Sequence, residues 1–217
     1  VITKPGIGMH ADINNEQLVL YYFPYADYRY PESKTIFSYE YHAPMGYVNY
    51  NGKSYIGADR YLWYTQNGKY YYLERRFEFY TFPSYILDMQ VINGTFVIAT
   101  STSNPSSGKY KNKHICEIIS TTGDVNGEWN STIISRNEGW IAKKMIVMDN
   151  GELLLYGSRR TYDYRGNGSL ILYKSTNGRD WSLLLNANIT SDNLFYLGDG
   201  KLISFGYPHY YSNNYGQ

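Results

Sequence analysis

The sequence predicts an all-β fold made of repeated four-stranded antiparallel units, and three observations support this. Thr65, Ser120 and Ser175 recur every 55 residues, and each opens a turn that closes on an aromatic residue. A fixed period of this size indicates one supersecondary unit copied several times. Helical periodicity is nearly absent, whereas short apolar runs alternate with two-residue turns, as in β-hairpins. Together these features predict a sheet protein built by repetition.

The hairpins are marked by dipeptides that favour positive φ angles. A type I′ turn needs positive φ at both central residues, which Asn-Gly and Asp-Gly tolerate best. The five candidate turns are Asn14-Asn15, Asn51-Gly52, Asn93-Gly94, Asn150-Gly151 and Asp199-Gly200, the first being the weakest. Each is flanked by apolar or alternating runs. Each hairpin therefore predicts the first two strands of a unit.

The recurring turns follow a third apolar run and precede a fourth strand. Four-stranded meanders repeated at this spacing are typical of the blades of a β-propeller, in which radial packing protects the sheet edges. The predicted blades span about 1–45, 46–84, 85–138, 139–190 and 191–217, the last incomplete. We expect either the N-terminal residues to complete it or the chain to be part of a longer protein, and favour the second. A β-sandwich is the alternative fold, but it would not predict the 55-residue period.

Composition excludes several classes of function. Lys plus Arg number 20 and Asp plus Glu 19, without a block of like charge, so nucleic acid is not an expected partner. No apolar run approaches the length of a membrane span, so we expect no membrane insertion in this segment. Cys116, the one cysteine, lies in an apolar run and is expected to be a buried structural thiol. The sequence indicates neither a cofactor nor a metal site, since its four histidines lack ligand spacing.

The turn after residue 173 allows a family resemblance to be stated. Ser175-Thr-Asn177-Gly178-Arg-Asp-Trp181 resembles the Asp-box, the bacterial neuraminidase repeat of sialidases and other propellers. The resemblance implies a folding turn on the outer rim of each blade, away from the central site. The structural positions expected from it are Thr65, Asn67, Gly68, Ser120, Asp124, Gly127, Trp129, Ser175, Asn177, Gly178 and Trp181. Hydroxyl and amide groups at such positions can bond the turn backbone while the indole covers it.

Tyr28-Arg29-Tyr30-Pro31 resembles a second sialidase motif, Phe-Arg-Ile-Pro, whose arginine binds the substrate carboxylate. A coincidence in a tyrosine-rich loop is the competing interpretation. The other two arginines of such a carboxylate site cannot be assigned in this sequence, and neither can a nucleophile and its base. No catalytic residue is therefore predicted, with Arg29 as the alternative. Retaining glycosidases need such groups within a few ångströms of one another.

Four glycosylation sequons begin at Asn93, Asn130, Asn167 and Asn188. About three would arise by chance in a chain so rich in Asn, Ser and Thr, so their number alone says little. With the 27 tyrosines, they favour an exposed location: extracellular, on a cell surface or on a virion.

The main expectation is a non-enzymatic propeller module that binds a glycan or a cell-surface or virion protein, with possible self-assembly. Its candidate ligand-binding residues, from the unrepeated tyrosine-rich segment, are Tyr25, Tyr28, Arg29, Tyr30, Tyr39 and Tyr41. These side chains could stack on sugar rings or instead pack on a neighbouring blade. Two alternatives stay open: a sialidase-type glycoside hydrolase that uses Arg29, and a purely architectural subunit of a filament or surface layer.

Overall fold

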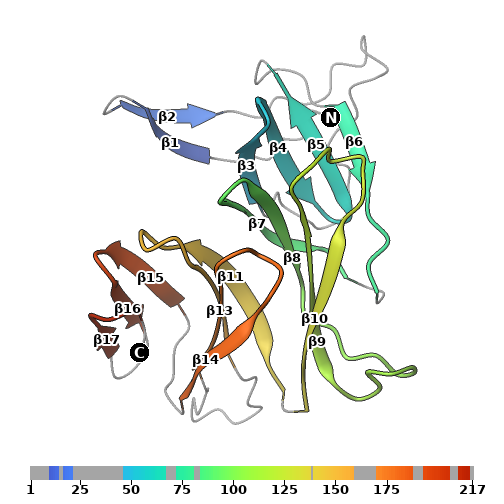
Figure 1. The fold of residues 1–217 in the computed structure, drawn as a ribbon, viewed down its shortest axis with the longest axis vertical. Helices are drawn as coiled ribbons and strands as arrows, with labels where there is room; N and C mark the ends of the chain where they lie inside the picture. The colour runs from blue at the N-terminus through green and yellow to red at the C-terminus, as the bar shows by residue number, and fades with distance from the viewer. Residues whose placement is uncertain are drawn as a thin grey trace, which may run out of the picture.

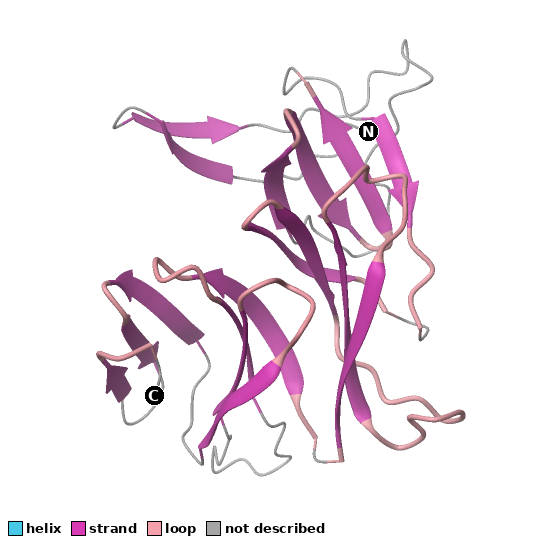
Figure 2. Cartoon of the chain, in the orientation of Figure 1, coloured by secondary structure: helices cyan, strands magenta, loops and turns pink. Residues whose placement is uncertain are grey.

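The computed structural model describes residues 10–14, 17–21, 46–66, 72–80, 84–137, 139–158, 170–187, 193–205 and 210–215. Within these ranges the chain forms strands, turns and loops without a helix (Figure 2). No helix there has the length and apolar character that a membrane crossing requires. The predicted all-β class is confirmed.

The strands form five antiparallel sheets, each made of strands consecutive in the chain. Their bounds are β1 His10–Asn14 and β2 Gln17–Tyr21; β3 Gly46–Tyr50, β4 Lys53–Ala58, β5 Tyr61–Thr65 and β6 Tyr72–Arg76; β7 Ile86–Ile92, β8 Thr95–Thr100, β9 His114–Thr121 and β10 Asn130–Arg136; β11 Ile141–Val147, β12 Leu153–Ser158, β13 Leu170–Ser175 and β14 Ser182–Ala187; β15 Asn193–Gly198, β16 Lys201–Phe205 and β17 Tyr210–Ser212. The three central sheets have four strands each.

The sheets follow one another around an arc, as blades of a β-propeller do (Figure 1). In the three central sheets the first strand lies innermost, since β7 contacts both β3 and β11 across the sheet boundaries. The β1–β2 and β15–β17 sheets stand at the two ends of the arc, on the same side of the molecule (Figure 1). The predicted propeller of four-stranded antiparallel blades is thus confirmed.

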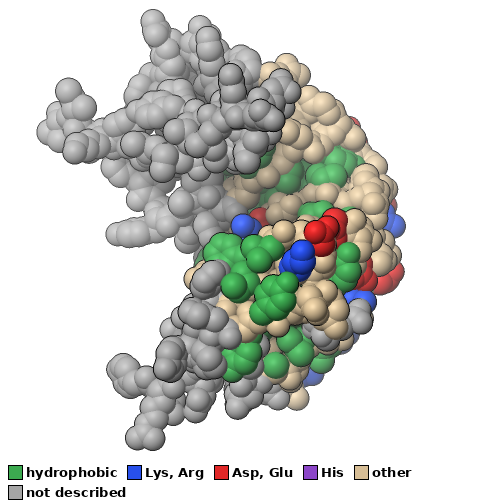
Figure 3. Space-filling view, turned by 90° about the vertical axis from the view of Figure 1, so that its left-hand side faces the viewer, with side chains coloured by type: hydrophobic (Ala, Val, Ile, Leu, Met, Phe, Trp, Pro, Cys, Tyr) green, Lys and Arg blue, Asp and Glu red, His purple; other side chains and the backbone are tan. Residues whose placement is uncertain are grey.

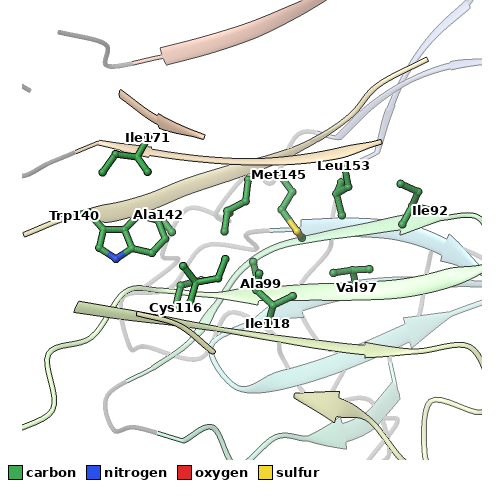
Figure 4. Packing of buried hydrophobic residues seen from close by; sticks show 12 residues of the cluster. Ile92, Val97, Ala99, Cys116, Ile118, Trp140, Ala142, Met145, Leu153 and Ile171 are labelled. Carbon is green, nitrogen blue, oxygen red and sulfur yellow. The ribbon is translucent and has the colours of Figure 1, made fainter. Parts of the chain in front are cut away.

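The core consists of layers between neighbouring sheets. In the layer between the third and fourth sheets, Val97 and Ala99 point toward Met145 and Leu153, and none of the four is exposed (Figure 4). Alternate residues of the same strands face the other way, as the period of two requires: Phe96 and Ile98 pack against the second sheet. Full burial of side chains of this size stabilises the fold by about 1.5–3 kcal/mol each.

Three of the predicted hairpin turns have the backbone that their sequence favours. Positive φ occurs at both central residues of Asn51-Gly52, Asn93-Gly94 and Asp199-Gly200. The turn at Asn150-Gly151 is wider: Met148 N–H donates to Glu152 O at 2.9 Å, and of its two central residues only Gly151 has positive φ. One added residue therefore converts the expected type I′ turn into a bulged one.

Cys116 lies inside β9 and is fully buried, as expected. Its thiol donates to Thr100 O at 3.0 Å, and burial raises its pKa to about 12. A thiol that stays protonated at neutral pH is a poor nucleophile. The structure therefore supports the structural role of this cysteine.

Candidate functional site

The innermost strands of the blades bring the middle of β7 close to the centre of the arc. β7 is flanked by β3 of the preceding sheet and β11 of the following one. It reads Ile86-Leu-Asp88-Met-Gln-Val-Ile, and Asp88 is its one charged residue. Asp88 is 5% exposed, so a carboxyl group sits in an otherwise apolar layer.

A β-bulge gives Asp88 its position. The pairing of β7 with β8 shifts register between Ile86 and Asp88, so Leu87 is the extra residue. Bulges re-aim the side chains next to them and are common beside active sites. β11 carries a matching irregularity between Ala142 and Lys144, next to the strand position that meets Asp88.

Both carboxyl oxygens of Asp88 accept backbone hydrogen bonds. Met89 N–H donates to Oδ1 at 2.8 Å, and Met145 N–H of β11 donates to Oδ2 at 2.8 Å. The second bond crosses from one sheet to the next, so the carboxyl group also links the two innermost strands. A buried carboxylate needs such donors because it has lost its water.

Burial nevertheless dominates the titration of this group. It raises the pKa of the Asp88 carboxyl from 3.8 to about 6, against the two backbone N–H groups, the positive charge of Lys144 and the Gln90 side chain, which all lower it. A shift of this size corresponds to about 3 kcal/mol between the protonated and ionised forms. The carboxyl group can therefore gain or lose a proton close to neutral pH.

Two side chains from the next sheet interact electrostatically with this carboxyl group. Lys144, on β11, is exposed and supplies the positive charge. Tyr156, opposite Lys144 on β12, is 6% exposed, and burial followed by the Asp88 charge raises the pKa of its hydroxyl. A titratable carboxyl beside a cation and a phenol is a combination suited to proton transfer.

The predicted rim positions of the third repeat form one hydrogen-bonded turn between β13 and β14. Ser175 Oγ accepts from Gly178 N–H at 2.9 Å and from Asn177 N–H at 3.3 Å. Asn177 Oδ1 accepts from the N–H groups of residues 179 and 180, both at 2.9 Å. Trp181 Nε1–H closes the turn on Gly178 O at 3.2 Å. The side chains of Ser175, Asn177 and Trp181 are thus hydrogen-bonded within the turn.

The longer second repeat forms a turn of the same kind between β9 and β10. Asp124 Oδ1 accepts from Asn126 N–H at 2.7 Å, Gly127 N–H donates to Asp124 O at 2.9 Å, and Trp129 Nε1–H donates to Val125 O at 2.9 Å. Ser120, which opens this repeat, is 1% exposed.

Both turns lie against the preceding sheet. In the second repeat, Arg75 of β6 donates to Val125 O at 2.8 Å and to Gly127 O at 2.7 Å. In the third, Asn93 Nδ2–H donates to Thr176 O at 3.1 Å, and Thr132 Oγ1–H donates to Arg179 O at 2.8 Å. These residues thus hold neighbouring blades together.

The remaining predicted residues divide between described and undescribed parts of the chain. Thr65, at the end of β5, is 5% exposed, and Asn130 is exposed at the start of β10. Asn93 lies in the β7–β8 turn, where its side chain amide is already hydrogen-bonded. The positions outside the described residues are Tyr25, Tyr28, Arg29, Tyr30, Tyr39, Tyr41, Asn67, Gly68, Asn167 and Asn188.

Asp88 was absent from the sequence-based candidates. In the sequence Asp88 is a single carboxylate within an apolar strand. This pattern is equally consistent with an exposed position, so the sequence does not show that Asp88 is buried. No group of three or more potential metal ligands occurs among the described residues. The structure therefore brings one new candidate to the centre of the propeller.

Comparison with known proteins concerns the fold. No protein-family model and no curated protein sequence matches the chain. Among solved structures, it is similar to a family 117 glycoside hydrolase of the marine bacterium Zobellia galactanivorans (TM-score 0.47, 12% identity) over 79% of this chain and 66% of that one, just under two thirds of that protein. It is also similar to an exo-1,5-α-L-arabinanase from a bovine ruminal metagenomic library (TM-score 0.33, 11% identity), over 76% of this chain and 89% of that one.

These structures correct one expectation from the sequence. Both are of glycoside hydrolases, which contradicts the main expectation of a non-enzymatic recognition module. At this identity the likeness concerns the arrangement of strands. It assigns no substrate and no residue role to this chain.

Proposed function

We propose that the chain forms part of a β-propeller glycoside hydrolase in which Asp88 exchanges a proton with the glycosidic oxygen. One observation carries the proposal: a carboxyl group with a pKa near 6 lies on an innermost strand, at a bulge, beside Lys144 and Tyr156. A general acid is most effective when its pKa lies close to the working pH. Burial is the usual means of raising a carboxyl pKa to that range.

The reaction needs a proton donor and a water molecule. Asp88 in its protonated form gives its proton to the leaving oxygen as the bond from the anomeric carbon to that oxygen breaks. The oxygen of water bonds to the anomeric carbon, and a second carboxylate takes the proton of the water. The carboxyl residues outside the described ranges are Glu16, Asp27, Glu32, Glu40, Glu138, Asp163 and Asp192.

The substrate class follows from the sequence motif. Because Tyr28-Arg29-Tyr30-Pro31 resembles the carboxylate-binding motif of sialidases, Arg29 is the proposed partner of an acidic sugar. A guanidinium group matches a carboxylate with two parallel hydrogen bonds. In this proposal Arg29 binds the substrate and Asp88 transfers the proton.

Hydrolysis of a panel of fluorogenic glycosides, including a sialoside, tests the proposal. We expect turnover by the wild-type chain and a loss of about 10²–10⁴-fold in kcat for Asp88→Asn. The wild-type pH profile should have a limb near pH 6 that Asp88→Asn removes. Asp124→Asn, which changes a carboxylate in a rim turn, is the matched control and should keep its activity. Unchanged turnover in a folded Asp88→Asn variant would rule out this role.

We also infer that the recurring turns are Asp-boxes. The hydroxyl, amide, glycine and indole groups of Ser175, Asn177, Gly178 and Trp181 bond one another as the motif requires, which supports the inference. Replacement of Trp181 by Phe should then lower stability without altering turnover. A large fall in kcat would instead tie this turn to the site.

An extracellular location is part of the same proposal, and Asn130 offers its test. Asn130 is exposed on an outer strand, whereas the Asn93 side chain holds the neighbouring rim turn. Secretion from a eukaryotic host should add a glycan at Asn130 and not at Asn93, as peptide mass spectrometry can measure. A glycan at Asn93 alone would contradict this assignment.

A further inference from the structure

Two lysines follow each other on β11, the innermost strand of the fourth sheet. Lys143 and Lys144 are both exposed, whereas the residues on either side of them, Ala142 and Met145, are 2% and 0% exposed. In a regular strand successive side chains point to opposite faces, so two consecutive exposed residues between buried ones need an interruption. The bulge between Ala142 and Lys144 supplies it, with Lys143 as the extra residue. The bulge therefore leaves both ammonium groups accessible to solvent.

The positive charge at this place is local. The described strands β3, β7 and β11, innermost in their sheets, together contain three charged residues: Asp88, which is buried, and the exposed Lys143 and Lys144. Elsewhere the charges are mixed, since the chain has a formal net charge of +1 and basic and acidic side chains are interspersed on the face in Figure 3. An anion near the centre of the arc would thus meet two ammonium groups beside one buried carboxyl group.

Neither lysine is ion-paired with a carboxylate within the part of the chain that the structure describes. The ion pairs found there involve Lys53, Arg60, Arg76, Lys174 and Lys201. Lys144 lowers the pKa of the Asp88 carboxyl group, but both oxygens of that group already accept backbone hydrogen bonds. Adjacent ammonium groups repel each other. A bound anion would remove this repulsion and accept charge-assisted hydrogen bonds from both side chains.

We propose that Lys143 and Lys144 form an anion-binding subsite beside Asp88 that takes a carboxylate or sulfate group of an acidic sugar. The inference deepens the proposed hydrolase function and rests on it for the sugar, but anion binding can be measured without turnover. Arg29, the other residue proposed to bind an acidic group, belongs to a different segment of the sequence. The lysine pair would hold the sugar next to the carboxyl group that transfers the proton.

An anion bound at Lys144 should also change the protonation of Asp88. The charge of Lys144 lowers the pKa of Asp88, against the larger effect of burial. An anion that pairs with Lys144 cancels this effect and favours the protonated carboxyl group, the form that donates. The other strands that contact β7 do not compete: β3 and β8 contain no charged residue, and Lys53 of β4 is paired with Glu74 at 3.1 Å. The Tyr156 hydroxyl stays protonated because its pKa is raised.

Matched sugars that differ only at carbon 6 test the subsite. Glucuronate and galacturonate carry a carboxylate where glucose and galactose carry a hydroxymethyl group, and the 6-sulfates of glucose and galactose carry a sulfate. None of them has a glycosidic bond that could be hydrolysed. In NMR titrations at constant ionic strength, we expect at least one acidic sugar to bind with a Kd about tenfold lower than its neutral counterpart. The preferred acidic group then distinguishes a carboxylate site from a sulfate site.

Variants assign this preference to the lysine pair. Lys143→Gln combined with Lys144→Gln should abolish it. Lys111→Gln is the matched control, because it removes the same charge from an exposed position in the β8–β9 loop, and it should keep the preference. Equal affinity for acidic and neutral sugars in the wild type would overturn the proposal. An unchanged preference in the double variant would overturn it as well.

The carboxyl ¹³C resonance of Asp88 gives an independent readout. Its pKa should rise above about 6 when an acidic sugar saturates the wild type, and should stay the same with the neutral sugar. Lys144→Gln should raise it without ligand and remove the response. No rise in the wild type would contradict a subsite beside Asp88.

Turnover separates this proposal from the proposed hydrolase function. If acidic sugars bind through the lysines and no glycoside is hydrolysed, the hydrolase function fails and the subsite remains. If acidic glycosides are hydrolysed with the same KM by the wild type and by the double lysine variant, the hydrolase function remains and the subsite fails.

Discussion

The rim turn at Ser175 and the central carboxyl group of Asp88 both bury polar atoms, but they satisfy them in different ways. Ser175 is 3% exposed, carries no charge and bonds to residues two and three positions away. Asp88 is 5% exposed, ionises near neutral pH and reaches across to another sheet. The hydrogen bonds of the Ser175 turn are made by residues close together in the sequence. The hydrogen bond from Met145 to Asp88 forms only once two sheets have packed, and the free-energy cost of burying a charge remains.

The largest expected effect comes from the glycine of the rim turn. Gly178 has φ +72°, and a Cβ there would lie 2.3 Å from Val97 Cγ2 of the preceding sheet. Gly178→Ala should therefore destabilise the fold by about 3–4 kcal/mol, from backbone strain plus overpacking. Gly151→Ala is the control, with φ +78° and open space around the new Cβ, and should cost about 1 kcal/mol. Urea unfolding measures both; similar losses would show that the turn does not depend on close packing between sheets.

The next effect is the pH dependence of the free energy of unfolding that Asp88 causes. Because the pKa of Asp88 is raised in the folded state, the folded protein binds this proton more tightly than the unfolded chain does. The resulting stabilisation is greatest below pH 4 and is lost as the pH rises through about 6. Its full size is about 3 kcal/mol. The difference in unfolding free energy between wild type and Asp88→Asn should thus change between pH 4 and 7. If the difference in unfolding free energy did not change with pH, the Asp88 carboxyl group would have an ordinary pKa, which would contradict this prediction.

A smaller loss of stability is expected when a hydrogen bond within the rim turn is removed. Ser175→Ala leaves Gly178 N–H and Asn177 N–H without their acceptor and should cost about 1–2 kcal/mol at any pH from 4 to 8. Ser182→Ala, at an exposed position of β14, should change stability by less than about 0.5 kcal/mol. A loss of stability in Ser175→Ala that depends on pH would contradict this difference between the rim turn and Asp88.

The same distinction explains what the sequence could predict. Asn93-Gly94, Ser175 and Trp181 act through neighbours only a few positions away, so turn chemistry and a repeat period were enough to find the blades. Asp88 acquires its properties from Met145 and Lys144, more than 50 residues later, and from a bulge that no local pattern announces. The central candidate therefore required the assembled sheets, and the expectation of a non-enzymatic recognition module is contradicted.

Both rim turns contact the sheet that precedes their own in the chain. The turn at residues 120–129 rests on the sheet made from residues 46–76, and the turn at 175–181 rests on the sheet made from residues 86–136. Each support precedes its turn in the chain and leaves the ribosome first. A blade can thus be completed on a finished predecessor as synthesis proceeds, which gives the assembly an inherent polarity from the amino to the carboxyl end.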